Sequence, residues 1–355
     1  MSTRSETDLI EIDGSFGEGG GQVLRTSLTM SVATGRPLRV VSIRAGRPKP
    51  GLMRQHLTSV RAAAKISDAR VTGDELGSTE ILFAPRTLRA GSYEFSIGTA
   101  GSCMLVSQTI VPALLRADGP STIALEGGTH NPAAPPWELI ERAYFPALAE
   151  MGADVSGRLE CHGFMPAGGG RVVVEVKPGA SRAYVKTQRT DILNQQVEAV
   201  FANLNVDIAR RELAVVGKQC ALGDEQLLLR EVKSQGPGNA LILTIEHDAG
   251  REVIAEFGVR GRSAEVVARS AAREAKAFLA TNAVIGRHLA DQLLVPMTLR
   301  GGGRFTTVKP SRHTVTNAEV IRKFCPGSIT ISHINEAGSL RSVEVTPMNK
   351  QGLST

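Results

Sequence analysis

The chain has 355 residues, which is enough for roughly two or three domain-sized hydrophobic cores. Its 42% hydrophobic and 21% charged residues are ordinary for a globular protein, and no apolar run is long enough to span a membrane. The polar N-terminal segment predicts no signal peptide, and the four cysteines lack CxxC spacing. We therefore expect a cytoplasmic protein with free thiols and no structural zinc or iron–sulfur site.

The net charge of +6 is consistent with a polyanionic partner. The basic residues are clustered, because six Lys or Arg and no Asp or Glu lie between Arg44 and Lys65. A solvated basic loop would give the same pattern. Aromatic residues make up only 4% of the chain, so a base-stacking platform is poorly supported and phosphate contacts are the better expectation.

Helix-like and strand-like segments alternate along the chain. Helical spacing of apolar residues predicts a helix over Trp137–Met151, which Pro146 is expected to kink. Other expected helices are Ser263–Ala280, with Ser263 as its N-cap, Asp191–Leu204, Val284–Leu294, and one after the glycine-rich turn in Gly98–Gln108. Residues with β-branched side chains predict strands at Leu38–Ile43, Ile81–Ala84, Ser121–Leu125, Arg171–Val176 and Ala240–Ile245.

Three glycine triplets indicate a repeated helix-plus-sheet unit. Two of them begin near-identical segments, GGGRVVVEVKP from Gly168 and GGGRFTTVKP from Gly301, and the third is Gly19–Gly21. With a two-residue insertion, Ala183 after the first segment aligns with His313 after the second. We expect an α+β fold of three such units. Residues 1–185 and 281–355 would form the large repeat domain, and residues 186–280 an inserted smaller α/β domain.

His313 is the best candidate for a nucleophile. A neutral imidazole is abundant near pH 7, and its nitrogen can attack phosphorus. A structural histidine is the common alternative, and the contrast with Ala183 favours chemistry. The P-loop, the complete GxGxxG pattern and the lysine motif of polynucleotide ligases are absent from the sequence.

Other polar residues lie in glycine-rich or apolar surroundings. Glu18, in DGSFGEGGGQVLR, suits a divalent cation, or is a solvated carboxylate in a tight turn. Gln108 would need hydrogen-bond partners if it is buried. The string HLADQ, from His288 to Gln292, places Asp291 near a helix end. The loop IRAGRPKPGLMRQH offers Arg44, Arg47, Lys49, Arg54, Gln55 and His56 to phosphate oxygens.

Taken together, the motifs resemble the RNA 3′-terminal phosphate cyclase family from Asp13 to about Val345. The strings that carry the resemblance are DGSFGEGGGQVLR, IRAGRPKPGLMRQHL, GSCMLVSQT, GGTHNPAAPP, HGFMPAGGG, QGPGN, SAEVVA, LADQL and KPSRHTVTN. The resemblance implies repeated four-stranded sheets with two helices, similar to the C-terminal domain of translation initiation factor 3. It also implies that a histidine attacks ATP, that AMP passes to an RNA 3′-phosphate, and that the 2′-hydroxyl closes a 2′,3′-cyclic phosphate.

The resemblance also assigns roles to individual residues. His313 would be the adenylylated nucleophile, and Glu18 would meet a magnesium or manganese ion. The nucleotide would be held by Gln108, His288, Leu289, Ala290, Asp291 and Gln292. The phosphate and RNA site would comprise Arg25, Arg44, Arg47, Arg54, Gln55 and His56. This chain departs from some members at His288, where they have tyrosine, and at Arg312, where they have cysteine, which leaves the nucleotide preference open.

Two other functions stay open. A non-catalytic relative that binds RNA in ribosome assembly would lack the nucleophile, so the presence of His313 weighs against it. An enzyme similar to enolpyruvyl transferases would share the repeat architecture and use basic residues for anionic substrates, without covalent nucleotide or RNA. The expected partners are ATP and an RNA with a 3′-terminal phosphate, with no membrane, and a homodimer stays open.

Overall fold

The structure, a computed structural model, describes residues 9–334 and 339–348. The outer ends of the predicted domains and most of the N-terminal segment that predicts no signal peptide lie outside these residues. Within them, no helix combines the length and the apolar character needed to cross a membrane.

Three units of the chain share one topology, strand–helix–strand–helix–strand–strand, with the strands ordered first, second, fourth, third. In each unit the first two strands are parallel. Unit 1 comprises β1 (Ile10–Asp13), α1 (Gly21–Thr34), β2 (Leu38–Val41), α2 (Arg54–Ser67), β3 (Arg70–Thr72) and β4 (Ile81–Ala84). Unit 2 comprises β5 (Ser92–Ser96), α3 (Cys103–Leu114), β6 (Ser121–Gly127), α4 (Trp137–Leu139), η2 (Ile140–Tyr144), α5 (Phe145–Glu150), β7 (Asp154–Cys161) and β8 (Gly170–Lys177).

Unit 3 is split by a further folded segment. It comprises β9 (Tyr184–Lys186), α8 (Arg287–Leu299), β14 (Gly303–Val308), α9 (Arg312–Phe324), β15 (Ile329–His333) and β16 (Leu340–Val345). Between β9 and α8 lies the insert: β10 (Ile192–Ala202), α6 (Val206–Cys220), η3 (Asp224–Gln226), β11 (Leu227–Glu231), β12 (Gly238–His247), β13 (Gly250–Phe257) and α7 (Ala264–Leu279). Its sheet has a different order, β11-β10-β12-β13. The predicted α+β fold of three repeated units is confirmed, and the limits 186–280 of the insert stay a prediction.

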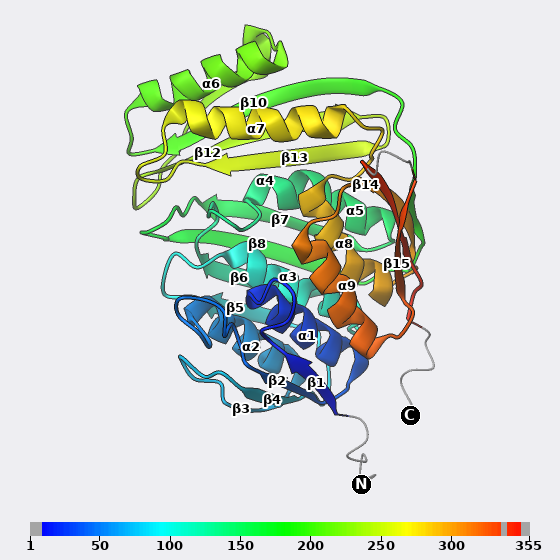
Figure 1. The fold of residues 1–355 in the computed structure, drawn as a ribbon. Coiled ribbons are helices and arrows are strands. Elements are labelled where there is room, and N and C mark those ends of the chain that lie inside the picture. The colour runs from blue at the N-terminus through cyan, green and yellow to red at the C-terminus, as the bar shows by residue number, and fades with distance from the viewer. Residues whose placement is uncertain (1–8, 335–338, 349–355) are drawn as a thin grey trace.

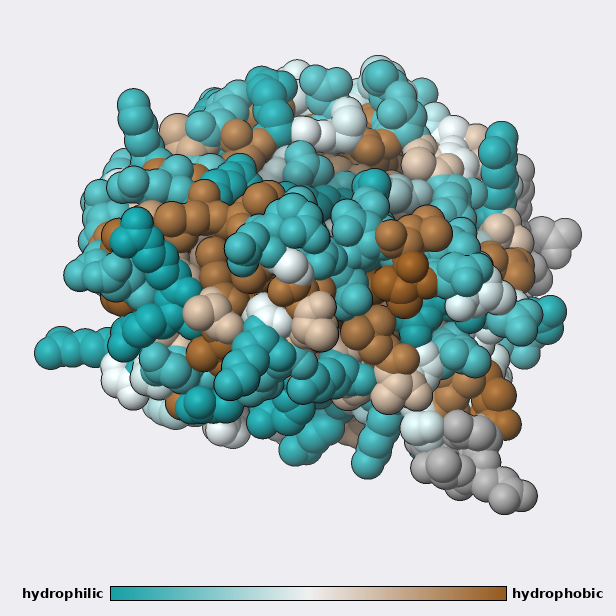
Figure 2. Space-filling model, turned by 90° about the horizontal axis from the view of Figure 1, so that it is seen from above, coloured by the Kyte–Doolittle hydropathy of each residue, from teal (hydrophilic) through white to brown (hydrophobic). Residues whose placement is uncertain are grey.

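The helices of the three units lie between their sheets. Figure 1 shows the sheet of unit 1 at the bottom, the sheet of unit 3 at the right edge, and the insert at the top with α6 and α7 covering the outer face of its sheet. The helices α1, α3, α8 and α9 contact one another and contribute to one continuous hydrophobic core. Seen from above, the surface is mainly hydrophilic, with smaller hydrophobic areas between the polar side chains (Figure 2).

Arg189 holds together the two chain segments that lead into and out of the insert. This side chain is 5% exposed, its guanidinium donates to the carbonyl oxygens of Phe278 and Thr281, and it lies 4.4 Å from the centre of the Phe278 ring. The beginning and the end of the insert therefore lie side by side.

One predicted element is wrong, because Asp191–Leu204 is mostly the strand β10 and not a helix. The strand is central in its sheet, between β11 and β12, and its second half, from Val197 to Ala202, is buried on both faces. Val197 and Phe201 pack under α6 and α7, while Val200 packs into the core of the main body. A strand buried on both faces lacks the polar–apolar alternation that reveals a strand.

The other predicted elements are present, with shifted ends. The helical stretch from Trp137 to Glu150 is irregular as expected, because the π-helical turn η2 precedes Pro146, which has no amide N–H to donate. Ser263 caps α7 by accepting from Val266 N at 3.4 Å. The helix predicted at Val284–Leu294 is α8, which begins at Arg287 and ends at Leu299.

The glycine triplets are not equivalent positions of the repeat. The triplet of unit 1 precedes its first helix, that of unit 2 precedes its fourth strand, and that of unit 3 precedes its second strand. The alignment of Ala183 with His313 is therefore wrong, and their contrast does not support a catalytic histidine. The topological equivalent of α9 in unit 1 is α2, which carries His56 in its first turn.

The helices α3 and α8 share a sequence pattern that the sequence analysis missed. Both helices have glutamine at their sixth position, Gln108 and Gln292, and Val-Pro at their ninth and tenth positions. Each is the first helix of its unit. The shared pattern therefore reflects the same structural place, and it brings the two glutamines to the same cleft.

Unit 2 and unit 3 are joined at Arg300, which is 6% exposed and follows α8. Its guanidinium donates to four carbonyl oxygens of unit 2 and the segment after it, at 2.7 to 3.2 Å: Leu115, Met151, Gly152 and Gly179. These bonds satisfy carbonyl groups at the ends of two helices, which have no partner within their own helix.

We expect Arg300→Met to lower the free energy of unfolding by about 2 to 4 kcal/mol, because it leaves buried carbonyl groups without donors. Urea denaturation would measure the loss. Arg304→Met, at an exposed position of β14, is the matched control and should change stability little. Equal stability of the Arg300 variant and the control would contradict the expectation.

Candidate active site

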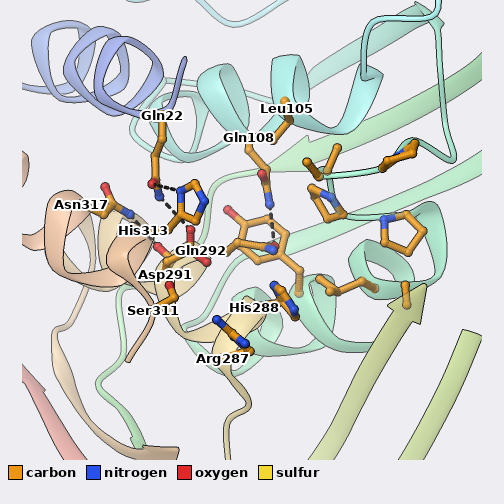
Figure 3. A pocket seen from close by; sticks show the side chains of 18 of the residues that line it. Gln22, Leu105, Gln108, Arg287, His288, Asp291, Gln292, Ser311, His313 and Asn317 are labelled. Atoms are coloured by element: carbon orange, nitrogen blue, oxygen red, sulfur yellow. Dashed lines mark hydrogen bonds between the residues drawn. The ribbon is translucent and has the colours of Figure 1, made fainter. Parts of the chain in front are cut away.

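A cleft of about 670 Å³ lies where helices of all three units meet the insert. Figure 3 shows polar side chains from α1, α3, α8 and α9 pointing into it. Its polar lining includes Gln22, Arg25, Gln108, Glu256, Arg262, Ser270, Arg273, Glu274, Arg287, His288, Asp291, Gln292, Ser311, His313 and Asn317. Apolar lining comes mainly from the loop at 132–136 and from β13. A cleft of this volume is typical of small-molecule sites.

His313 is presented at the start of α9. The helix begins there because the hydroxyl of Ser311 accepts from Thr314 N at 3.1 Å, which caps the first turn. His313 is the second residue of the helix, and its side chain is 54% exposed. Its Nδ1 lies 2.8 Å from Gln22 Oε1 and 3.6 Å from Glu18 Oε1. No hydrogen bond of Nε2 is found among the described residues, so this atom is accessible to a ligand.

A chain of hydrogen bonds connects His313 to three helices. Gln22 of α1 donates from Nε2 to Asp291 Oδ2 of α8 at 2.7 Å. Asn317 of α9 donates to the carbonyl oxygen of Asp291 at 2.6 Å and accepts from the hydroxyl of Thr26 at 2.7 Å. Burial raises the pKa of Asp291, while His313, His288 and the hydrogen bond from Gln22 oppose this effect.

The loop between β1 and α1 brings Glu18 to His313. Gly17 has a φ of +63°, and a Cβ atom there would lie 2.2 Å from Thr316 Oγ1, so only glycine permits this close approach to α9. The backbone of Glu18 donates to Thr316 Oγ1 at 3.1 Å. The Glu18 carboxylate is 9% exposed and forms an ion pair with Arg47. The predicted metal ligand and one predicted phosphate ligand are therefore side by side, next to His313.

Three further predicted phosphate ligands form a group at the edge of the cleft, and one of them, Arg25, lines it. Burial lowers the pKa of His56 to about 3, and the charges of Arg25 and Arg44 lower it as well, so this histidine is neutral. Its Nδ1 accepts from Met53 N at 3.3 Å, at the start of α2. Burial also lowers the pKa of Arg25 to about 10, against the charges of Glu18 and Asp291, and Arg25 stays charged at neutral pH. Arg44 is held by the carbonyl oxygens of Lys49 and Gly51, both at 2.8 Å.

The predicted nucleotide ligands of α3 and α8 occupy the other part of the cleft. Gln108, which is half-buried, donates from Nε2 to Gln292 Oε1 at 2.5 Å. His288 Nε2 lies 3.0 Å from Glu274 Oε1 of α7. Burial lowers the pKa of His288, but the hydrogen bond and the charge of Glu274 outweigh it and raise the pKa overall. A histidine of the main body and a carboxylate of the insert therefore meet at the cleft.

Eight predicted ligands do not line the cleft, of which Glu18, Arg44, Arg47 and His56 lie beside it as described above. The other four have different places. Leu289 and Ala290 are 2% and 0% exposed and belong to the hydrophobic core. Gln55 Oε1 accepts from Ser102 N at 2.6 Å, which ties α2 to the start of α3. Arg54 is exposed on the first turn of α2. The structure therefore places these residues around the site, while the other predicted residues lie in or beside it.

The sequence analysis missed residues of two kinds. Asn317 was detectable, because it lies four residues after His313 and so on the same face of the helix. The insert contributes one wall of the cleft, which includes Glu256, Arg262 and Ser270. No sequence motif identifies these residues, because they reach the cleft only when the insert packs on unit 3. These three side chains bond to one another, with Arg262 and Ser270 both donating to Glu256.

The insert also holds the start of α8. Glu252 of β13 is 1% exposed, and its Oε2 accepts from Gly286 N, the N-cap of α8, at 2.8 Å. A Cβ atom on Gly286 would lie 1.9 Å from Glu252 Oε1, so glycine is required there. Burial raises the pKa of Glu252 to about 8, although the Gly286 amide lowers it. The carboxyl group is therefore largely protonated at neutral pH.

The family model described as RNA 3′-terminal phosphate cyclase matches residues 16–331 of this chain. Among curated relatives, the RNA 3′-terminal phosphate cyclase of Ralstonia nicotianae is 48% identical over 337 residues, covering 94% of this chain and 96% of the relative. The enzymes of the same description from Ectopseudomonas mendocina and Koribacter versatilis are 47% and 44% identical, covering 93% and 98% of this chain and 96% and 98% of theirs. A solved enolpyruvyl transferase from Streptomyces tendae aligns over 47% of this chain and 33% of its own, with 19% identity and a TM-score of 0.26, too low to bear on the fold or the function.

Glu252 gives a testable dependence of stability on pH. Its pKa is about 8 in the folded protein and about 4.3 in an unfolded chain, so the folded state holds an extra proton between these values. The free energy of unfolding should fall as pH rises through this window. We expect Glu252→Gln to flatten this fall in urea denaturation series from about pH 5 to pH 8, and the exposed Glu231→Gln to leave it unchanged. Parallel curves for both variants would contradict the assignment.

Proposed function

The chain belongs to the RNA 3′-terminal phosphate cyclase family, and from this premise we propose that it converts an RNA 3′-terminal phosphate into a 2′,3′-cyclic phosphodiester with ATP as co-substrate. The observation that carries the proposal is His313, an exposed imidazole with one engaged nitrogen and one accessible nitrogen at the edge of a nucleotide-sized cleft. Its carboxylate and guanidinium neighbours suit phosphate chemistry.

The first step is attack on ATP. A ring nitrogen of His313 forms a bond to the α-phosphorus, and the bond from that phosphorus to diphosphate breaks, leaving AMP on the histidine. Arg25, Arg44 and Arg47 would stabilise the negative charge of the phosphates. Because His56 is neutral in this cationic group, it can accept or donate a hydrogen bond without adding charge.

The next steps use the RNA end. A 3′-phosphate oxygen bonds to the phosphorus of the AMP group, and the bond to His313 breaks. The RNA phosphate then carries AMP, a better leaving group than oxide. The neighbouring 2′-oxygen bonds to the 3′-phosphorus, loses its proton, and displaces AMP. The hydroxyl and the phosphate are on one ribose, so the ring closes at high effective concentration.

The nucleotide would lie in the part of the cleft bounded by α3 and α8. Gln108, His288, Asp291 and Gln292 present donors and acceptors there, and the proline-rich loop at 132–136 supplies an apolar wall for a base. Leu289 and Ala290 would contribute only by holding the backbone of α8, since both are buried in the core. The positively charged residues on the far side of His313, with Arg54 on the surface beyond, would hold the RNA end.

A divalent cation fits this site through Glu18. The described residues contain no group of three His, Cys, Asp or Glu side chains that could hold a metal by themselves. A single carboxylate suits magnesium or manganese, which keep waters and take substrate phosphate oxygens as ligands. When bound, such an ion would neutralise charge on the phosphates. Glu18 is paired with Arg47, so the cation and this arginine would share the carboxylate.

The homodimer that the sequence analysis left open stays open. A cytoplasmic location suits an enzyme that acts on RNA ends, and it stays a prediction.

Labelling with ATP tests the nucleophile. We expect the protein, incubated with ATP radiolabelled at the α-phosphate and a magnesium or manganese salt, to become covalently labelled. His313→Ala should abolish the labelling, and His333→Ala, an exposed histidine of β15, is the matched control that should keep it. Full labelling of the His313 variant would contradict the assignment.

The RNA reaction is tested by resistance to phosphatase. An RNA with a radiolabelled 3′-phosphate should become resistant after incubation with the protein and ATP. The same RNA with a 2′-deoxy terminal sugar lacks the hydroxyl that closes the ring, so it should stop at the 3′-phosphate that carries AMP, which its gel mobility distinguishes from the cyclic product. Unchanged sensitivity of the ribose-ended RNA, with the protein labelled, would show another acceptor for AMP.

A further inference from the structure

Gln22 is buried at 8% exposure, and its side chain forms hydrogen bonds to both His313 and Asp291. The proposed function gives it no role. It comes from α1 in unit 1, whereas both of its partners belong to unit 3. The orientation of a buried amide between two polar partners is set by the partner that can only donate or only accept a hydrogen bond.

That partner is the carboxylate of Asp291. A carboxylate accepts hydrogen bonds and has no proton to donate, so it must face the NH₂ group of Gln22, as the distance of 2.7 Å from Nε2 to Oδ2 shows. The amide oxygen is then the atom that faces His313. It accepts hydrogen bonds only, so Nδ1 of His313, at 2.8 Å, must carry the proton.

The position of Asp291 is fixed in turn. The hydroxyl of Thr26 donates to Asn317 Oδ1, which leaves the Asn317 NH₂ group facing the carbonyl oxygen of Asp291. Glu18 Oε1, 3.6 Å from Nδ1, is a second acceptor on the same side of the ring. Every oriented group around this edge of the imidazole therefore favours a proton on Nδ1.

We propose that Gln22 is a positioning residue that holds the proton of His313 on Nδ1 and so makes Nε2 the nucleophilic nitrogen. A neutral imidazole has one proton and one lone pair, so fixing the proton fixes the lone pair. When Nε2 bonds to a phosphorus, the proton stays on Nδ1, hydrogen-bonded to Gln22 Oε1, and no proton has to move. This inference rests on the proposed function for the identity of the electrophile, but the tautomer itself does not depend on any reaction.

Nitrogen-15 NMR of histidine-labelled protein tests the tautomer without ATP or RNA, because protonated and bare ring nitrogens have different chemical shifts. The chain has seven histidines, and the signals of His313 are those that disappear in a His313→Gln sample. We expect the intact protein to show a proton on Nδ1 and a bare Nε2. Gln22→Met, which keeps the length of the side chain and removes both hydrogen bonds, should give a mixture of tautomers.

Asp291→Asn gives a second test, in which the ring proton should move from Nδ1 to Nε2. The asparagine amide can donate to Gln22 Oε1, so the Gln22 amide can turn its NH₂ group towards Nδ1, which moves the ring proton to Nε2. Ser27→Ala is the control in the same helix, because the Ser27 hydroxyl donates to Val23 O within α1, its one hydrogen bond among residues 9–334 and 339–348. This control should keep the Nδ1 proton.

The rate of labelling provides the functional measure. At saturating ATP, Gln22→Met should form the covalent AMP about 10- to 100-fold more slowly than the intact protein, the usual cost of removing a residue that orients a histidine. Ser27→Ala should label at the normal rate.

A proton on Nε2 in the intact protein, or an unchanged tautomer and labelling rate in Gln22→Met, would overturn the inference. If the intact protein shows the Nδ1 proton and Gln22→Met loses it, the positioning role stands. Absence of labelling in the intact protein would then count against the proposed function alone.

Discussion

The hydrogen bond between Gln22 and Asp291 joins residues 269 positions apart in the chain, and the candidate site exists only where it forms. It fixes α1 of unit 1 against α8 of unit 3, and His313 of α9 bonds to the same amide. No unit contains the site alone. The packing of three similar units is therefore a chemical requirement as well as a source of stability.

Repetition explains how the cleft acquires its ligands. The first helices of units 2 and 3 place Gln108 and Gln292 at the same helical position, and the second helices of units 1 and 3 place His56 and His313 in their first turns. The environment separates the two histidines, since His56 is buried among arginines and His313 is exposed beside Glu18. One architectural position thus serves as a neutral lining in one unit and as a candidate nucleophile in another.

Local sequence patterns predicted most of this structure, and their failures have clear physical causes. Strands with one buried face and helices with caps, such as Ser263 before α7, are encoded locally. The strand β10 was mistaken for a helix because its second half is buried on both faces. The glycine triplets looked equivalent because similar turns recur at different places in a unit. Site residues in recognisable motifs were predicted, whereas Glu274 and the rest of the insert wall depend on packing between distant segments.

The clasp of Arg189 on Phe278 and Thr281 has a consequence for the order of assembly. The strand β9 must wait for β14, its parallel partner, until the whole insert has been made. A disordered segment of that length would oppose the pairing through the entropy of closing a long loop. Once the insert has folded and its ends are clasped, the chain between the two strands behaves as a short connection. Early folding of the insert would thereby speed the completion of unit 3.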